Sequence, residues 1–307
     1  MDREAQAAMA ERFRDLHRSG RLLLLANAWD AASARVFELE GFPALGTTSA
    51  GVAASMGFPD GESMPFRTHL GVARRIVECV RIPVSLDLER GYAGGVSELQ
   101  GNIVLALEAG MVGVNLEDTV AGSGSPGGSR LRDIGEQCDR IRAVREAATA
   151  HGVPLVINAR TDALLDARDA GSNAIAEAIR RGNRYREAGA DCVFVPDLET
   201  LLEDDIVRLV AELNAPLNLI AGRRTPPVRR LEEIGVSRLS FGPRPMRTLL
   251  FTLQQMAREW MEEGTYGRML EGRLGYEAVN SWFRERRGTA PSSDRSPGPP
   301  VPHSPAP

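Results

Sequence analysis

The 307-residue sequence predicts a (β/α)8 barrel (a TIM barrel) with an extra C-terminal helix, and three observations support this prediction. Eight short runs rich in Val, Ile and Leu recur along the chain, and each interval between them leaves room for a helix. Strands that alternate with helices form parallel βα units. The runs are almost continuously apolar, which is typical of strands covered on both faces. An open doubly wound sheet is the alternative, but no run precedes a G-x-G-x-x-G turn.

The apolar runs place the eight strands in order along the chain. We expect them near Leu22–Ala26, Ala44–Thr48, Val84–Leu88, Val112–Leu116, Leu155–Ala159, Cys192–Val195, Leu217–Ala221 and Arg238–Phe241. Asp30 is placed to cap the helix after the first strand. Two further pairs have the spacing of a capping box, namely Ser97 with Gln100 and Thr200 with Glu203. Three glycines stand where helices are expected to end: Gly41, Gly110 and Gly189.

Two helices and a tail flank the predicted barrel. The first 20 residues are charged and place Met9, Phe13 and Leu16 at helical spacing. After the eighth strand, apolar residues from Met246 to Trp260 also follow helical spacing and predict an amphipathic helix that needs a partner surface. We expect a single domain over residues 1–288 and a disordered Pro/Ser-rich tail over residues 289–307.

Composition excludes several classes of protein. The net charge of −4 and the pI near 5.7 disfavour a nucleic-acid-binding surface, which shows as clustered basic charge. The N-terminus lacks the apolar stretch of a signal peptide, and no apolar run approaches the roughly 20 residues that cross a bilayer. Three widely spaced cysteines, Cys79, Cys138 and Cys192, fit neither a disulfide framework nor a zinc site. We therefore expect a cytoplasmic protein with reduced thiols and no membrane partner.

The sequence contains no lysine, so all 37 basic residues other than histidine are arginine. A lysine Schiff base, a P-loop lysine and a lysine general base are therefore excluded. The three histidines before the tail, His17, His69 and His151, fall in predicted helices or at their ends, and we expect them at the surface. Catalysis is left to a metal, carboxylates, arginine, tyrosine or hydroxyl groups.

Acidic residues are concentrated at the ends of the third and fourth predicted strands, where active sites of this fold form. Asp87 and Glu89 follow the third strand, Glu117 and Asp118 follow the fourth, and Asp60 lies in the loop after the second. These side chains either cap helices and pair with arginines or, repelling one another, hold a cation. Oxygen ligands and retained waters favour Mg²⁺, with Mn²⁺ as the alternative.

Arg160 follows the fifth predicted strand and is open to two interpretations. It is either the partner of Asp162 in a structural ion pair or a bidentate clamp for a substrate carboxylate. A metal beside such a clamp suits chemistry that must stabilise an enolate oxyanion, because a Lewis acid supplies several kcal/mol there.

Several segments resemble the isocitrate lyase/phosphoenolpyruvate mutase superfamily, in order and at plausible spacing between about Leu22 and Arg247. They are NAWD from Asn27, TTSAG from Thr47, GFPD from Gly57, PVSLDLERGY from Pro83, GVNLED from Gly113, NARTD from Asn158 and AGAD from Ala188. The resemblance implies a metal site in which Asp87 binds Mg²⁺ directly while Asp60, Glu89 and Glu117 act largely through waters. It also implies that Arg160 contacts the substrate carboxylate or phosphonate.

The resemblance extends to the substrate pocket and to assembly. It implies that the turn Thr48–Ser49–Ala50 receives the carboxylate and carbonyl of a 2-oxo acid, and we expect Trp29 and Asn218 to contribute to the same pocket. It further implies that the helix after the eighth strand is exchanged between subunits of a homodimer or homotetramer.

This sequence departs from both well-known branches of the superfamily. The lyases carry a K-[KR]-C-G-H loop where Thr119–Arg130 reads TVAGSGSPGGSR, without Lys, Cys or His. Pro196 stands where the lyases place a glutamate and the mutases a histidine, and the lysine and asparagine of the mutase loop are missing too. The sequence is closer to an oxaloacetate decarboxylase/phosphonomutase-like branch that lacks the cysteine loop. Water, Tyr92 or a hydroxyl such as Ser123 or Ser125 is then left to deliver a proton.

Three functions remain open at this point. The first is a Mg²⁺-dependent lyase or decarboxylase that cleaves a C–C bond in a small 2-oxo or 2-hydroxy carboxylate through an enolate. The second is C–P chemistry of the phosphoenolpyruvate mutase or phosphonopyruvate hydrolase type, which needs more cationic groups than Arg160 alone. The third is a barrel that binds a metabolite without turning it over.

Overall fold

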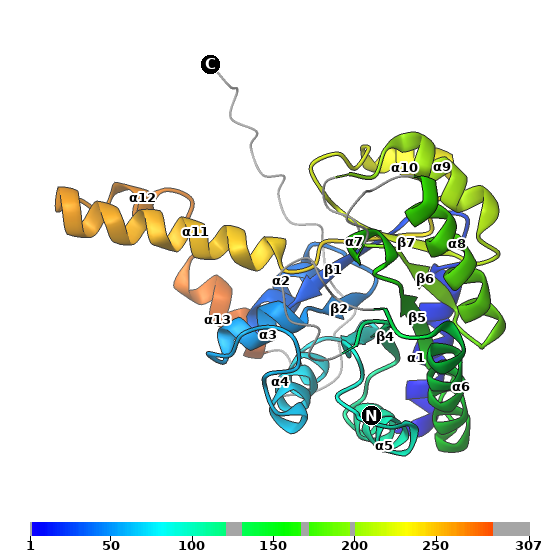
Figure 1. Ribbon diagram of the computed structural model, residues 1–307. Helices are drawn as coiled ribbons and strands as arrows, with labels where there is room; N and C mark the ends of the chain where they lie inside the picture. Colours follow the sequence, from blue (N-terminus) through cyan, green and yellow to red (C-terminus); the bar gives the residue numbers. More distant parts are fainter. Residues whose placement is uncertain (1, 121–130, 167–171, 197–199, 285–307) are drawn as a thin grey trace. The chain divides into compact units, whose positions relative to one another are not determined.

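The computed structural model describes residues 2–120, 131–166, 172–196 and 200–284, and its centre is a closed barrel of eight parallel strands (Figure 1). Each strand pairs with its neighbours in sequence, and β8 closes onto β1 with Leu23 opposite Arg238. The strands are β1 (Leu23–Ala28), β2 (Leu45–Thr47), β3 (Val84–Asp87), β4 (Gly113–Glu117), β5 (Val156–Arg160), β6 (Cys192–Phe194), β7 (Leu217–Ile220) and β8 (Arg238–Ser240). The predicted barrel is confirmed, and the open doubly wound sheet is excluded.

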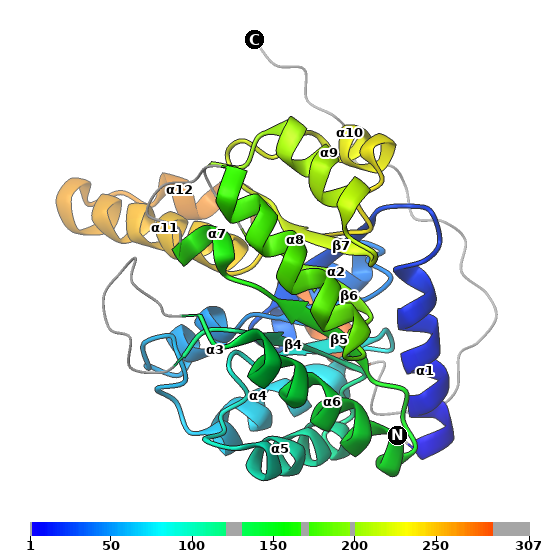
Figure 2. The same cartoon turned by 45° about the vertical axis from the view of Figure 1, so that its right-hand side comes forward.

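Helices surround the strands, as a view turned by 45° shows (Figure 2). In order along the chain they are α1 (Arg3–Leu16), α2 (Ala31–Leu39), α3 (Ser49–Ser55), α4 (Phe66–Cys79), α5 (Val96–Glu108), α6 (Ile134–His151), α7 (Ala163–Asp166), α8 (Ser172–Glu187), α9 (Glu203–Glu212), α10 (Val228–Ile234), α11 (Arg244–Arg258), the π-helical turn η1 (Glu259–Glu263), α12 (Gly267–Leu270) and α13 (Tyr276–Arg284). Apolar outward-facing strand residues such as Val114, Leu116 and Leu219 are buried between the barrel and this layer.

Some predicted helix signals are confirmed and others are wrong. Asp30 caps α2, because its side chain accepts a hydrogen bond from the Ser33 amide. Gly41, Gly110 and Gly189 all have positive φ angles just after a helix. The two other predicted capping boxes are wrong. Helix α5 begins at Val96 after an extended Gly95, and α9 begins at Glu203, where the Asp205 carboxylate accepts from the Leu202 amide.

Helix α1 packs against the barrel and buries Phe13 and His17. The Phe13 ring lies where a side chain on Gly113 would stand, so the helix approaches β4 closely. His17 is only 4% exposed and its Nδ1 lies 2.8 Å from the Phe13 carbonyl oxygen. The predicted surface position of His17 is therefore wrong, because the apolar stripe of α1 continues through its C-terminal turn.

Burial of His17 predicts a pH-dependent stability. Burial, with the nearby Arg238 cation, lowers the pKa of His17 from 6.5 to about 3. The unfolded chain then binds more protons than the native one between these values, so the unfolding free energy rises with pH across this window. As the pH falls through this window, the unfolding free energy decreases by at most about 1.4 kcal/mol per pH unit because of His17. Urea unfolding between pH 4.5 and 7.5 should show a shallower dependence for His17→Phe than for the wild type.

The matched control for this measurement is His151→Phe, at the half-buried C-terminal residue of α6. It should keep the slope of the wild-type protein. An unchanged slope in His17→Phe would show that other groups cause the acid sensitivity.

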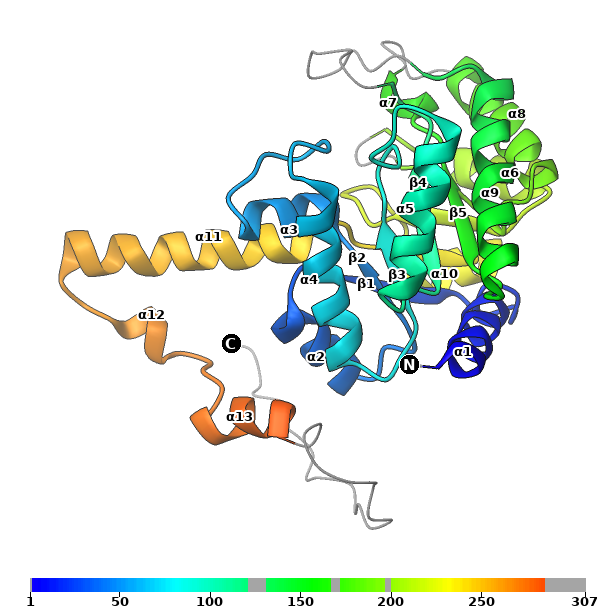
Figure 3. The same cartoon turned by 90° about the horizontal axis from the view of Figure 1, so that it is seen from below.

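The predicted helix after β8 is confirmed as α11, which leads away from the barrel (Figures 1 and 3). Its side chains Leu249, Leu250, Phe251 and Leu253 are more than half exposed. The chain divides into two compact units, Met1–Tyr266 and Gly267–Pro307, and the second contains α12 and α13. The predicted single domain to residue 288 and the exchange of α11 between subunits stay predictions. The predicted disordered tail lies outside the described residues.

No helix in the described part of the chain combines the length and the apolar character that crossing a bilayer requires.

Candidate active site

A cavity of about 240 Å³ opens at the carboxyl ends of the strands. In barrels of this type the active site forms at this end, because the loops after the strands converge there. Polar and apolar residues share the wall. The described residues that line it are Asn27, Thr48, Ser49, Ala50, Asp60, Asp87, Asn115, Arg160, Leu165, Phe194, Pro196, Ile220, Ser240, Gly242 and Pro243. The cavity therefore brings together six of the residues that the sequence suggested: Thr48, Ser49, Ala50, Asp60, Asp87 and Arg160.

Asp87, the last residue of β3, is held by its neighbours on both sides. Its backbone N–H donates to Thr47 Oγ1 at 2.8 Å, which fixes the end of the strand. Its carboxylate accepts from the Ser49 amide at 3.0 Å and from Asn115 Nδ2 at 3.5 Å. One carboxylate is thus oriented by β4 on one side and by the start of α3 on the other.

The turn between β2 and α3 presents Thr48, Ser49 and Ala50 to the cavity. Thr48 caps α3, and its hydroxyl accepts from the Gly51 amide. A side chain at Gly51 would approach Thr48 to 2.6 Å and Trp29 to 2.9 Å, so glycine is required for this tight turn. Trp29 packs behind the turn instead of lining the cavity.

Asp60, Glu89 and Glu117 lie near Asp87 and near one another. Burial raises the pKa of Glu89 to about 8, and the charges of Asp87, Asp60 and Glu117 add to the effect. Asp60 is at the exposed rim, yet partial burial of its carboxyl and the charge of Asp87 raise its pKa as well. Such mutual repulsion in a partly buried site is what a bound cation relieves.

The four carboxylates do not form a closed cage around one point. Among the residues that the structure describes, no three His, Cys, Asp or Glu side chains converge closely enough to hold an ion between them. The donor set still fits a hydrated divalent cation, because Mg²⁺ keeps several waters and uses only one or two carboxylates directly.

The loop after β3 has two left-handed residues other than glycine, Glu89 (φ 51°) and Tyr92 (φ 50°), on either side of Gly91, whose φ is also positive. This conformation is unfavourable for residues with a side chain. It turns Tyr92 back so that its hydroxyl donates to Glu89 Oε1 at 2.6 Å. Tyr92 does not line the cavity, and burial together with this hydrogen bond raises its pKa. The structure therefore places Tyr92 as a contact of Glu89.

His69 completes this cluster and was not anticipated as part of it. Its Nδ1 lies 3.1 Å from the Tyr92 hydroxyl, and the residue is fully buried. The predicted surface position of His69 is wrong, because the face of α4 that carries it packs onto the barrel. Burial lowers its pKa, which favours the neutral ring beside the phenol. The contact of His69 with Tyr92 depends on how α4 packs against the loop after β3, and no local sequence pattern indicates that packing.

Glu117, at the end of β4, accepts contacts from three directions. Thr119 Oγ1 donates to it at 2.7 Å, Arg160 Nη1 lies at 3.0 Å and Arg90 Nη1 at 3.7 Å. Arg90, which follows Glu89 in the sequence, also binds Glu62 at 3.2 Å. Sequence reasoning overlooked Arg90, although its position inside the motif after β3 could have signalled it.

Arg160, at the end of β5, makes the ion pair and also lines the cavity. Its Nε and Nη2 donate to the two oxygens of Asp162 at 2.6 and 2.8 Å. Its guanidinium carbon lies 5.8 Å from the centre of the Phe194 ring, and its side chain remains 23% exposed. One edge of the guanidinium is occupied by Asp162, and Nη1 is shared with Glu117. These contacts use three of the five guanidinium N–H groups.

Asp118 has a structural role as a buried hydrogen-bond acceptor. It is fully buried and accepts from the Tyr185 hydroxyl at 2.7 Å, from the Asp162 amide at 2.9 Å and from Arg181 at 3.2 Å. It therefore ties the end of β4 to α8 and to the segment after β5.

The remaining suggested residues lie apart from the cavity or outside the described chain. Asn218 is fully buried inside the barrel, where its Oδ1 accepts from Ser240 at 3.4 Å. Ser123 and Ser125 lie outside the described residues, as does most of the segment Thr119–Arg130. Pro196 does line the cavity and, with Phe194, Leu165 and Ile220, makes one wall apolar.

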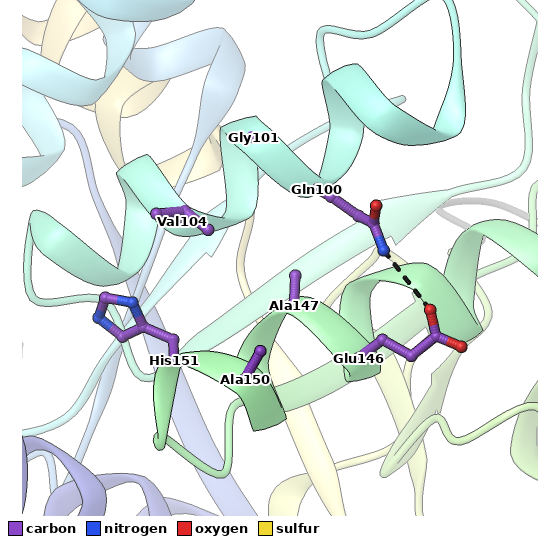
Figure 4. A pocket seen from close by; sticks show the side chains of 7 residues that line it. All are labelled: Gln100, Gly101, Val104, Glu146, Ala147, Ala150 and His151. Atoms are coloured by element: carbon purple, nitrogen blue, oxygen red, sulfur yellow. Dashed lines mark hydrogen bonds between the residues drawn. The ribbon is translucent and has the colours of Figure 1, made fainter.

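Two other hollows lack this chemistry. One lies between α5 and α6 (Figure 4) and is lined by Gln100, Gly101, Val104, Glu146, Ala147, Ala150 and His151. Its only hydrogen bond drawn joins Gln100 to Glu146 at 3.5 Å. The other is mostly apolar and lies beside α2 and the start of α11, with Trp29, Phe37 and Leu249 in its wall. Neither gathers the carboxylates found at the mouth of the barrel.

Known proteins resemble this chain over most of its length. Residues 13–261 match the family model described as phosphoenolpyruvate phosphomutase. A 2-methylisocitrate lyase of Halalkalibacterium halodurans is 33% identical over 228 residues, which cover 73% of this chain and 71% of the lyase. The crystal structure of a candidate phosphonomutase from Burkholderia cenocepacia J2315 is 38% identical, with a TM-score of 0.77, and the match covers 83% of this chain and 99% of that one. A candidate lyase/mutase from the same strain is 32% identical, with a TM-score of 0.81, and 91% and 97% of the two chains are covered.

Proposed function

The chain belongs to the phosphoenolpyruvate phosphomutase family, and on this premise we propose that it is a divalent-metal-dependent lyase. Its proposed reaction cleaves a C–C bond in a small 2-oxo or 2-hydroxy carboxylate. The observation that carries the proposal is the pairing, in one cavity, of Asp87 and Asp60 with Arg160, the one cationic side chain among the described residues of its wall. The proposed metal-binding end and carboxylate-binding end then face one cavity of about 240 Å³.

We assign the metal-binding end to Asp87, with Asp60, Glu89 and Glu117 acting through water. Asp87 is the carboxylate whose orientation is fixed by two hydrogen bonds while it still lines the cavity. The raised pKa of Glu89 supports a bound cation nearby, because a positive charge restores the ionised form. A bound Mg²⁺ or Mn²⁺ would supply Lewis-acid stabilisation of the negative charge that develops on the substrate.

The residues of the chain orient the substrate between these two ends. Two N–H groups of Arg160 that neither Asp162 nor Glu117 uses bind its carboxylate. In the first turn of α3 the Ser49 amide donates to Asp87 and the Gly51 amide to Thr48, so we assign the adjacent oxygen to the Ala50 amide. Phe194 and Pro196 keep water from the opposite side. Tyr92 is engaged by Glu89 and His69, so we assign delivery of the final proton to a water molecule.

C–P chemistry is the second candidate, and the similarity to a candidate phosphonomutase at 38% identity favours it. A phosphoryl group carries more charge than a carboxylate and needs several donors around it. Among the described residues that line the cavity, Arg160 is the only cation. This limited positive charge is why we place C–C cleavage first.

An assay of both reaction types tests the proposal. The purified protein with Mg²⁺ is offered oxaloacetate, phosphonopyruvate and a panel of 2-oxo and 2-hydroxy acids, and pyruvate or the matching 2-oxo product is measured. We expect turnover of oxaloacetate or of another 2-oxo or 2-hydroxy acid in the panel, and no turnover of phosphonopyruvate. Turnover of phosphonopyruvate alone would overturn the order of the two candidates. Binding of Mg²⁺ and oxalate with no turnover of any acid would instead identify a metabolite-binding barrel.

Thiol alkylation gives a further expected result. Cys192 and Cys138 are buried, Cys79 ends α4, and none of the three lines the cavity. Burial also raises the pKa of Cys192 to about 12, which suppresses the reactive thiolate. We expect activity to survive iodoacetamide under native conditions. Rapid inactivation that Mg²⁺ and oxalate prevent would show instead that a thiol serves the reaction.

A further inference from the structure

The inner side of the barrel, just below the cavity, is unusually polar. In barrels of this type branched apolar side chains usually fill the interior. Here the inward positions of β4, β5, β7 and β8 carry Asn115, Asn158, Asn218 and Arg238, all at most 6% exposed. These residues are neither at the surface nor, except for Asn115, in the wall of the cavity.

Among these four residues, Arg238 is the one whose burial is hardest to explain by a contribution to stability. It is fully buried, and burial lowers its pKa to about 10. Its Nη2 donates to Asn115 Oδ1 at 3.3 Å, while its Nε and Nη1 have no hydrogen-bond partner among the described residues. A buried charge without a carboxylate partner is unfavourable, and an apolar residue of similar volume is often as stable or more stable.

The contact of Arg238 with Asn115 fixes the direction of an amide group. An arginine only donates hydrogen bonds, so the atom of Asn115 that faces it must be the oxygen. Asn158 Nδ2 donates to the same oxygen at 2.8 Å. The Asn115 amide nitrogen is thereby turned toward Asp87 Oδ1, 3.5 Å away. Without these donors the Asn115 side chain can rotate away from the carboxylate, and Asp87 then loses this hydrogen bond.

We propose that Arg238 is a positioning residue for the metal site and acts through Asn115. It holds the Asn115 amide so that it supports one oxygen of Asp87, while the Ser49 amide supports the other. The inference rests on the proposed function in one respect, the assignment of Asp87 as a metal ligand. Groups that orient a ligand in this way change metal affinity by about 10- to 100-fold when they are lost.

Charge and orientation predict opposite results for the loss of Arg238. Removing a cation from below the site would, by Coulomb attraction alone, tighten the binding of a divalent metal. Releasing the Asn115 amide would weaken it. We expect Arg238→Met to bind Mn²⁺ about 10- to 100-fold more weakly by calorimetry, with a Tm equal to or above that of the wild-type protein. Arg238→Lys keeps both a donor and the charge and should retain most of the affinity.

Two further variants show whether Asn115 transmits the effect. Asn115→Leu should weaken Mn²⁺ binding by itself, and adding Arg238→Met to it should weaken binding no further, since coupled residues are not additive. Cys192→Ala is the matched control, because Cys192 is a fully buried residue of β6 near Arg238 whose thiol donates to the Val193 carbonyl oxygen. It should lower the Tm and leave Mn²⁺ affinity within about twofold.

The outcomes separate this inference from the proposed function. A wild-type protein that binds no Mn²⁺ or Mg²⁺ would overturn the metal site itself. A wild-type protein that binds Mn²⁺, together with an Arg238→Met variant that binds it equally or more tightly, would overturn only the positioning role. If Arg238→Met does not fold, Arg238→Gln replaces it, because a glutamine amide accepts as well as donates and no longer fixes the direction of Asn115.

Discussion

Replacing Asp87 with alanine is expected to abolish metal-dependent activity, with a loss of at least about 1,000-fold in kcat/KM, or roughly 4 kcal/mol. Asp87 is the carboxylate that both lines the cavity and is oriented by hydrogen bonds from Ser49 and Asn115. Water cannot replace both its charge and its position. Activity is measured after chelation and reconstitution with Mg²⁺, and metal binding is measured by calorimetry.

The other carboxylates should give graded effects. Glu89→Ala and Glu117→Ala are expected to weaken metal affinity while leaving the fold intact, because a group that acts through water is partly replaced by water. Asp139→Ala is the control, since Asp139 is exposed on α6 and pairs with Arg142 at the surface. Wild-type activity in reconstituted Asp87→Ala would show that the metal site is assigned to the wrong residue.

Replacing Arg160 with lysine should lower kcat/KM by about 10- to 1,000-fold, or roughly 1.4–4 kcal/mol of transition-state stabilisation. Lysine keeps the positive charge but loses the planar fork. Arg160 uses that fork to hold Asp162 and Glu117 while it still presents N–H groups to the cavity. A single ammonium group cannot make all of these contacts.

The structural and functional roles of Arg160 are separated by measuring Tm together with kinetics. A purely structural ion pair would lower the Tm and leave kcat/KM almost unchanged, whereas a substrate contact raises KM, lowers kcat, or both. Arg180→Lys is the control, because Arg180 is exposed on α8 and pairs with Glu177 on the same helix. A fully active Arg160→Lys enzyme would assign Arg160 to the ion pair alone.

The candidate site was predictable where it depends on strand ends. Asp87, Glu117 and Arg160 were found because carboxyl ends of parallel strands meet at one end of a barrel. Local sequence was less informative about helix starts, as the two wrong capping boxes show. A Ser or Thr three residues before a Gln or Glu also occurs at positions where no helix begins. The first residue of each helix depends instead on the path of the loop that follows the preceding strand.

His69 and Arg238 could not be assigned from the sequence for a different reason. Their neighbours are distant along the chain: His69 contacts Tyr92, 23 residues away, and Arg238 contacts Asn115, 123 residues away. The almost continuously apolar character of the strand runs does not show which residues face the inside of the barrel. A strand alternates its side chains between two faces, so polar residues such as Asn115 and Asn158 stand inside the barrel while apolar neighbours face the helices.

The sequence by itself determined the barrel, its extra helix and the carboxylates at its mouth, because these follow from periodicity and from the direction of parallel strands. The tertiary structure decided which of these groups share a cavity. It placed Asp118 in a buried contact with Tyr185 and Trp29 behind the Thr48–Ala50 turn instead of in the cavity wall, where it was expected. It also showed that Arg160 both pairs with Asp162 and lines the cavity. Those outcomes depend on burial and on contacts between distant segments, and no local pattern of residues encodes either.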